Sequence, residues 1–291
     1  MNFKTYLQEQ KLKTTTISGH LNNLKRFIKW AESESINYKT ATYNQLLEFI
    51  QSFQNRNVSK MSVNLHLNSI TKYYDYLVIT AERTDNPAKE IRLKSNQKRV
   101  LKNVFTTQEL EEIYTTYQNR PVWKINQGQA TNSHQRNLVI LGLFIFQGVQ
   151  TSELKKLEKS HLNLLQGTIY IPSIARSNSR NLKLNVRQIL PLQIYLNQTA
   201  KDQETLFKPA QISNSLTYLK LLINNQLKNE KTPIRNAQHI RSSVIMNWLK
   251  QYNIRQVQYM AGHKYISSTE RYKEEDLKTL QEQISLHHPM K

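Results

Sequence analysis

Residues 138–154 read LVILGLFIFQGVQTSEL, a long apolar run followed by a short polar segment. From Leu138 to Phe146 nearly every residue is apolar, which is typical of a helix buried on all its faces. Gly148 then offers the left-handed conformation in which many helices end. We therefore expect a buried helix that ends at Gly148, with the polar residues Gln150 to Leu154 directly after it.

A β-hairpin interrupts the helices that follow. Apolar residues alternate with polar ones on both sides of the polar turn Arg176–Arg180, a period typical of strands. These apolar residues are Ile169, Ile171, Leu182, Leu184 and Val186. The pattern predicts a hairpin within residues 167–192. Helical periodicity then returns over residues 189–200, 211–228, 238–251, 254–261 and 275–285.

A further helix is expected before the apolar run. Thr106 or Thr107 can cap its N-terminus, and the glutamates that follow suit the positive end of a helix that continues to Tyr117. The polar stretch 120–133 is expected to be irregular. Together these segments predict a domain over residues 104–291 that is mostly helical and carries a small β-hairpin or sheet.

The first 90 residues predict a separate bundle of four or five short helices. Thr14 to Thr16 offer an N-cap for one helix, and Ser59 offers an N-cap for another. The last helix should end before Pro87, because proline disfavours helical conformation in the residue before it. A cluster of aromatic residues is interpreted as core, with nucleic-acid stacking as the alternative; it comprises Tyr73, Tyr74 and Tyr76.

Composition narrows the class of protein. The chain has 291 residues, no cysteine, and 41 Lys and Arg against 21 Asp and Glu, so 41 − 21 gives a net charge of +20. The length suits two domains, and the lack of cysteine excludes disulfide scaffolds, thiolate metal sites and cysteine nucleophiles. No apolar run is long enough for a membrane span and the N-terminus does not resemble a signal peptide, so we expect a cytoplasmic protein without membrane contact. The charge favours a polyanionic partner, double-stranded DNA first, over a basic surface kept for solubility alone.

Positive charge is concentrated between the two predicted domains. Residues 91–103 lack apolar periodicity and contain several cations, among them Lys94, Lys98, Arg99 and Lys102. Such a segment can be a solvated linker, or it can lie along a phosphate backbone and bind DNA. The two interpretations are compatible, and we favour both.

The order of several motifs resembles the tyrosine recombinases, also called phage integrases. The N-terminal region with its exit Asn86-Pro87-Ala88 is similar to the SAM-like core-binding domain of that family. Gly148 to Leu154 resembles the family stretch G-L-R-x-S-E-L. Arg241, Gly262-His263 and Tyr272 match the later motifs, with His263 22 residues after Arg241 and Tyr272 nine after His263. The resemblance covers nearly the whole chain and implies a mainly α fold, in which a SAM-like helical domain precedes a mixed α+β catalytic domain.

The resemblance also implies a chemistry. Enzymes of this family cut and rejoin DNA, because a tyrosine hydroxyl attacks a phosphodiester and the resulting 3′-phosphotyrosine conserves the bond energy. Tyr272 would then be the nucleophile, while Arg241 and His263 would bind the phosphate. Taken singly, Arg241 could instead form a surface salt bridge, and His263 could cap a helix. No metal and no cofactor are expected.

The family assembles as tetramers on paired DNA sites. The resemblance therefore implies partners that are copies of this chain or other recombinase subunits. A C-terminal helix expected over residues 275–286 would dock on a neighbouring subunit, or alternatively on its own domain.

Three positions depart from the family pattern. Gln150 stands where the family has its first arginine, and Gln238 stands where it has a histidine, with His239 one residue out of register. Asn178 falls near the place of the hairpin lysine, and the cations within reach are Arg176, Arg180 and Lys183. A glutamine donates a hydrogen bond but carries no charge. Two functions therefore stay open: a site-specific recombinase, and a degenerate relative that binds DNA as an accessory protein without cutting it.

Overall fold

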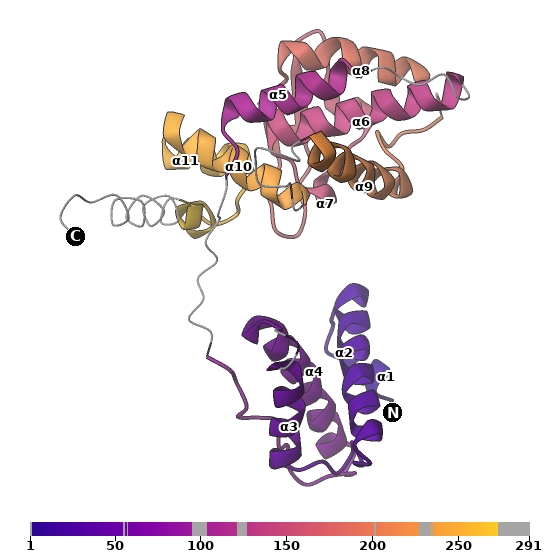
Figure 1. Cartoon of the computed structure of the whole chain (residues 1–291), viewed down its shortest axis with the longest axis vertical. Helices are drawn as coiled ribbons and strands as arrows, with labels where there is room; N and C mark the ends of the chain where they lie inside the picture. Colours follow the sequence, from indigo (N-terminus) through magenta and orange to yellow (C-terminus); the bar gives the residue numbers. More distant parts are fainter. Residues whose placement is uncertain are drawn as a thin grey trace, which may run out of the picture. The chain divides into compact units, whose positions relative to one another are not determined.

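The computed structural model divides the chain into two compact units, Met1–Lys98 and Arg99–Lys291 (Figure 1). It describes residues 2–54, 56, 58–94, 104–120, 127–200, 202–226, 234 and 236–272. The expected linker cations Lys98, Arg99 and Lys102 and the expected helix over 275–286 lie outside the described residues. Helices dominate both units, and the second adds a small antiparallel sheet, so the predicted mainly α fold class is confirmed.

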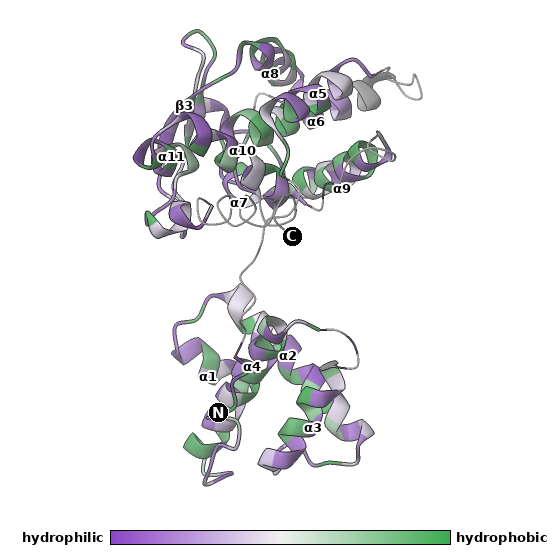
Figure 2. Cartoon of the chain, turned by 60° about the vertical axis from the view of Figure 1, so that its left-hand side comes forward, coloured by the Kyte–Doolittle hydropathy of each residue, from purple (hydrophilic) through white to green (hydrophobic). Residues whose placement is uncertain are grey.

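The described helices of the first unit are α1 (Phe3–Glu9), α2 (Thr14–Ser33), α3 (Tyr43–Gln54) and α4 (Lys60–Ile79). α2 packs along α4. All four helices carry both apolar and polar residues, seen as green and purple in Figure 2. The aromatic residues of α4 are buried, which confirms their interpretation as core; they are Tyr73, Tyr74 and Tyr76.

One helix cap of the first unit follows the prediction and one does not. Ser59 caps α4 by accepting a hydrogen bond from the Ser62 amide at 3.2 Å, as expected. The expectation that Thr14–Thr16 cap α2 is wrong, because the carbonyl of Lys13 accepts the first helical hydrogen bonds. The threonines therefore lie in the first turn of the helix.

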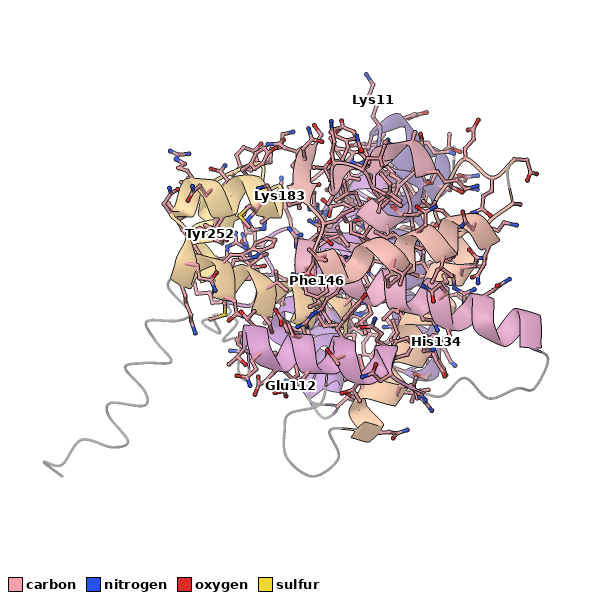
Figure 3. All side chains as sticks on the ribbon, turned by 90° about the horizontal axis from the view of Figure 1, so that it is seen from above. Lys11, Glu112, His134, Phe146, Lys183 and Tyr252 are labelled. Atoms are coloured by element: carbon pink, nitrogen blue, oxygen red, sulfur yellow. The ribbon has the colours of Figure 1, made fainter. Side chains whose placement is uncertain are left out.

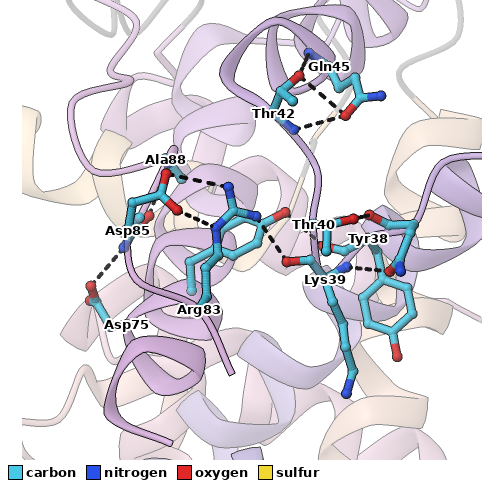
Figure 4. A network of polar contacts seen from close by, with 12 residues as sticks. Tyr38, Lys39, Thr40, Thr42, Gln45, Asp75, Arg83, Asp85 and Ala88 are labelled. Carbon is cyan, nitrogen blue, oxygen red and sulfur yellow. Dashed lines mark hydrogen bonds and ion pairs between the residues drawn. The ribbon is translucent and has the colours of Figure 1, made fainter. Parts of the chain in front are cut away.

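Polar side chains hold the segment that follows α4 (Figure 4). Arg83 donates a hydrogen bond to Asp85 Oδ1 at 2.7 Å and another to the Lys39 carbonyl at 2.9 Å. Asn86 donates to Asp75 Oδ1 at 2.7 Å. These hydrogen bonds fix the path of the segment that leaves α4, which includes the expected exit at Asn86.

The start of the expected linker is anchored on α4. The side chain of Asn64 accepts from the Leu93 amide at 2.9 Å and donates to the Leu93 carbonyl at 2.8 Å. Lys94 follows with an exposed side chain. These two hydrogen bonds fix the backbone as far as Leu93, and the side chain of Lys94 is exposed to solvent directly after it.

In the second unit, the long helix α6 (Gln127–Gln147) packs against α5 (Thr107–Gln118), α8 (Val186–Gln198), α9 (Pro209–Gln226) and α10 (Ala237–Gln251). Residues 138–145 of α6 are all buried, so the predicted buried helix is confirmed. Thr106 and Glu109 form the expected cap of α5 by bonding to each other's backbone amides. None of the helices in the described part of the chain has the length and apolar character that a membrane crossing requires.

α6 begins earlier than expected. Residues 120–133 were predicted to be irregular, but the helix starts at Gln127. Its polar first half is held by tertiary hydrogen bonds: Gln135 donates to the Pro191 carbonyl at 2.8 Å, and Arg136 donates to Ser215 at 3.1 Å. These partners lie on α8 and α9, more than 50 residues away in the sequence, so no local pattern indicates them.

The sheet contains β1 (Leu162–Asn163), β2 (Thr168–Ile171) and β3 (Arg180–Lys183) in the order β1-β2-β3, all antiparallel. The predicted hairpin is confirmed for β2 and β3, with Ile169 paired to Leu182 and Ile171 paired to Arg180, but Val186 was wrongly assigned to it, because Asn185 caps a helix that begins at Val186. The two-residue strand β1 was not expected, since it is too short to show a period. Because side chains alternate along β3, Arg180 shares the buried face with Leu182.

Candidate active site

Distant segments meet around the end of α6. The short helix α7 (Thr151–Leu154) follows that end, and beside it lie β3, the first half of α10, the turn after α11 (Ile254–Ala261) and the helical residues 267–272. Gly148 ends α6 with φ +55°, and Gly262 ends α11 with φ +67°, conformations that glycine adopts without strain. A Cβ at residue 262 would lie 2.9 Å from Arg180 Cζ, so a glycine is required there.

Glu153 is the centre of a buried ion-pair network. Its carboxylate accepts hydrogen bonds from Arg180 Nη1 at 2.7 Å and Nη2 at 3.0 Å, from Ser177 Oγ at 2.6 Å, and from the Gln150 amide at 2.7 Å. The side chains of Glu153 and Arg180 are both 0% exposed. Burial opposes ionisation, yet the Arg180 guanidinium and the hydrogen bonds lower the pKa of Glu153, so the carboxylate is charged.

Arg241 joins this network from α10. Its guanidinium donates to the Gly148 carbonyl and, at 2.6 Å, to the Ala261 carbonyl, and it lies 4.0 Å from Glu153. Burial lowers the pKa of Arg241 to about 10, which leaves the group charged at neutral pH. Arg241 is only 2% exposed, so the surface salt bridge is excluded. Two guanidiniums around one carboxylate leave one excess positive charge, which suits an anionic ligand.

His263 and Tyr272 lie side by side. Their rings stack with centroids 5.9 Å apart and an interplanar angle of 9°. His263 Nδ1 is 2.8 Å from the Thr269 hydroxyl. Burial, and then the charges of Arg241 and Arg180, lower the pKa of His263 to about 4, so the imidazole is neutral at pH 7.

Gln238 and His239 face different surroundings. Gln238 is exposed in the first turn of α10 and donates a hydrogen bond to the Tyr272 hydroxyl at 3.5 Å. His239 is buried, and its ring lies 5.1 Å from that of Phe105 in the core. His239 therefore does not take the place of the family's histidine, since the residue beside the Tyr272 hydroxyl is Gln238.

The three hairpin cations differ in their exposure to solvent. Arg176 and Lys183 are exposed, and Lys183 is labelled in Figure 3. Arg180 is buried and paired with Glu153, because its position in the strand alternation turns it inward. The hairpin itself is fastened beside His263, since the Asn178 amide donates to the Gly262 carbonyl at 2.9 Å.

Two residues of this cluster carry no signal in the sequence. Ser177 and Thr269 are small polar residues that bond to Glu153 and His263 across 24 and 6 residues. Neither is distinguishable from the many other serines and threonines of the chain. Gln150, which the motif did indicate, is partly buried and is the N-cap residue of α7; its carbonyl accepts from the amides of Glu153 and Leu154, and its own amide donates to the Glu153 carboxylate.

A cavity of about 100 Å³ lies elsewhere, between α5, α6 and α10. Phe146 and Tyr252, labelled in Figure 3, are among its lining residues, and none of the predicted site residues lines it. Within the described ranges, no three His, Asp or Glu side chains are grouped so that they could hold a metal ion.

Two family models match the chain. Residues 1–80 match the phage integrase N-terminal SAM-like domain, and residues 103–278 match the phage integrase family. TnP I resolvase of Bacillus thuringiensis is 24% identical over 275 residues, which cover 92% of each protein. Tyrosine recombinase XerC of Bacillus licheniformis is 24% identical over 308 residues, covering 99% of this chain and 95% of the relative.

Solved recombinase structures share the fold. XerH site-specific recombinase bound to palindromic difH substrate has a TM-score of 0.70 at 17% identity, covering 92% of this chain and 79% of that one. A lambda integrase dimer bound to a COC′ core site has a TM-score of 0.68 at 13% identity, covering 94% and 75%. The second family model alone matches more than half of the 291 residues, and this chain therefore belongs to the phage integrase family of tyrosine recombinases.

Proposed function

We propose that this chain is a site-specific DNA recombinase that cuts and rejoins DNA through a 3′-phosphotyrosine intermediate. The observation that carries the proposal is the meeting of Tyr272, His263 and Arg241 beside a buried cluster with one excess positive charge. Such surroundings suit attack on a phosphodiester, because charge on the nonbridging oxygens has to be stabilised in the transition state.

In the proposed step, the Tyr272 oxygen bonds to phosphorus while the bond from phosphorus to the 5′ oxygen breaks. The tyrosine loses its proton and the leaving 5′ oxygen gains one, so no co-reactant is needed. Arg241 binds a nonbridging oxygen with guanidinium donors beyond the two that bond to Gly148 and Ala261. His263 donates a hydrogen bond to the same phosphate. Rejoining is the reverse step with a different 5′ hydroxyl.

The positions that depart from the family pattern have a place in this proposal. Gln150 faces the phosphate as a neutral donor, and the exposed cations Arg176 and Lys183 supply part of the missing charge. Arg180 acts indirectly, since its guanidinium is committed to Glu153. The partners are double-stranded DNA and further recombinase subunits, identical or related, that form a tetramer on paired sites.

DNA binding should depend strongly on salt. With a net charge of +20, we expect both units and the linker cations to neutralise phosphates, so that log affinity falls linearly with log salt by about 0.9 for each neutralised phosphate. Changing Lys94, Lys98, Arg99 and Lys102 to glutamine should make the slope shallower by about 0.9 for each phosphate that is no longer neutralised. Fluorescence anisotropy with a labelled duplex across a salt series measures the slope.

The matched control for this measurement is Lys39→Gln. This substitution removes one positive charge where the linker variant removes four, and Glu82 already pairs with Lys39 at 2.7 Å, so the slope should stay that of the unmodified chain. An affinity that does not change with salt would rule out binding through phosphate contacts.

A nicked suicide substrate tests the proposed reaction. After cleavage the short fragment that carries the new 5′ hydroxyl diffuses away, so the covalent protein–DNA adduct accumulates and survives a denaturing gel. The duplex is first selected from a random pool by binding to this protein. We expect an adduct, and we expect Gln150→Arg to form it faster, by analogy with arginines worth about 10³-fold or more at other phosphoryl-transfer sites.

The accessory function is favoured by one observation, the uncharged Gln150 at an arginine position. Under that alternative the chain binds the selected duplex but never cuts it. If neither the unmodified chain nor Gln150→Arg yields an adduct on bound DNA, the recombinase proposal fails and the accessory function replaces it.

A further inference from the structure

Thr269 is a buried partner of His263. It lies in the helical residues 267–272 and is 0% exposed. Its hydroxyl is 2.8 Å from His263 Nδ1, and its backbone amide donates to the Ile266 carbonyl at 2.7 Å. The hydroxyl and the imidazole are thus held together by the turn that leads to Tyr272.

The burial of Thr269 decides the direction of this hydrogen bond. A buried hydroxyl proton requires an acceptor. Among the described residues, His263 Nδ1 is the acceptor within reach of this hydroxyl. The hydroxyl therefore donates, Nδ1 accepts, and in a neutral imidazole the proton is then carried by Nε2.

We propose that Thr269 is a positioning residue for the recombination reaction: its hydroxyl holds His263 in the Nε2–H tautomer, which donates a hydrogen bond and cannot take the proton of Tyr272. This inference rests on the proposed function. The low pKa of His263 keeps the ring neutral around pH 7, so the tautomer decides which ring nitrogen can donate a hydrogen bond.

NMR of the free protein tests the tautomer without DNA or catalysis. The chain is labelled with ¹⁵N-histidine, and His263→Gln identifies the His263 signals among those of the eight histidines. We expect a protonated Nε2 and an unprotonated Nδ1. Thr269→Ser should keep this pattern, whereas Thr269→Val, which removes the hydroxyl at nearly constant shape, should give a mixture of both tautomers.

Cleavage kinetics test the consequence for the reaction. Thr269→Val should slow single-turnover cleavage of the nicked substrate on the order of tenfold, by analogy with the loss of outer hydrogen-bond partners of metal-binding histidines. Thr269→Ser should cleave at nearly the rate of the unmodified chain, because it keeps the hydroxyl, and both variants should bind DNA equally. Rescue by serine separates hydrogen bonding from packing.

The outcomes distinguish this inference from the proposed function. A protonated Nδ1 in the unmodified chain, or one Nε2–H tautomer retained in Thr269→Val, overturns the role of Thr269. If Thr269→Val does not fold, the tautomer of the unmodified chain and of Thr269→Ser still decides. Absence of any covalent adduct overturns the recombinase function instead and leaves the NMR result standing.

Discussion

Tyr272→Phe should bind the selected duplex as tightly as the unmodified chain and form no covalent adduct with it. Only the hydroxyl is removed, and the ring keeps its stacking on His263 and its packing beside Ile245, Val257 and Ala261. The hydrogen bond that disappears, from Gln238 at 3.5 Å, is exposed and contributes little to stability. Removal of the nucleophile from other covalent enzymes costs on the order of 10⁶-fold in rate. The measurement is the adduct band on the nicked substrate after denaturing electrophoresis.

Tyr265→Phe is the matched control. Tyr265 lies seven residues before Tyr272, is 66% exposed, and loses the same single oxygen atom. We expect it to form the adduct at the normal rate. An adduct that persists in Tyr272→Phe would mean that another group is the nucleophile, and a matching loss in Tyr265→Phe would point to that residue.

Glu153→Gln should destabilise the second unit by about 3–5 kcal/mol, because it leaves the guanidiniums of Arg180 and Arg241 buried without a carboxylate. Glutamine keeps the shape and part of the hydrogen bonding, so the effect measures the charge. Native-state hydrogen exchange of the buried amides of α6 measures the free energy of unfolding of the second unit separately from that of the first. Protection there should fall by the same free energy.

Glu158→Gln is the control for this charge. Its side chain is 51% exposed beside His161, and its loss should change stability by less than about 0.5 kcal/mol. Replacing Glu153 and Arg180 together by methionine should restore part of the lost stability, since the unpaired charge next to Arg241 is then reduced. If Glu153→Gln exchanges like the unmodified chain, the network does not stabilise the fold.

Much of the architecture could be predicted because its signals are local. The caps at Ser59 and Thr106, the apolar run from Leu138 and the alternation around the hairpin each depend on residues within a few positions of one another. The prediction failed where distant partners decide, as for the start of α6, which is held by Pro191 and Ser215. It also failed for β1, whose two residues form a strand only because β2 lies beside them.

The candidate site was predictable only as a set of residues. The resemblance to the recombinase motifs indicated that Arg241, His263 and Tyr272 belong together, but nothing in those motifs distinguishes an exposed cation from a buried one. Arg176 and Arg180 looked alike in the sequence, and the strand alternation with the position of Glu153 separates them. Likewise, only the packing of α10 shows that Gln238 faces Tyr272 while His239 faces Phe105.

The sequence by itself determined the two-part helical organisation, the family and the motif residues, because periodicity and capping depend on neighbouring residues and the motifs are recognised by their order along the chain. Only the tertiary structure decided how the charges are arranged. Arg180 pairs with Glu153 across 27 residues, and Arg241 reaches the Gly148 carbonyl across 93. The energy of a buried charge depends on what surrounds it after folding, and residues from four separate segments provide those surroundings here.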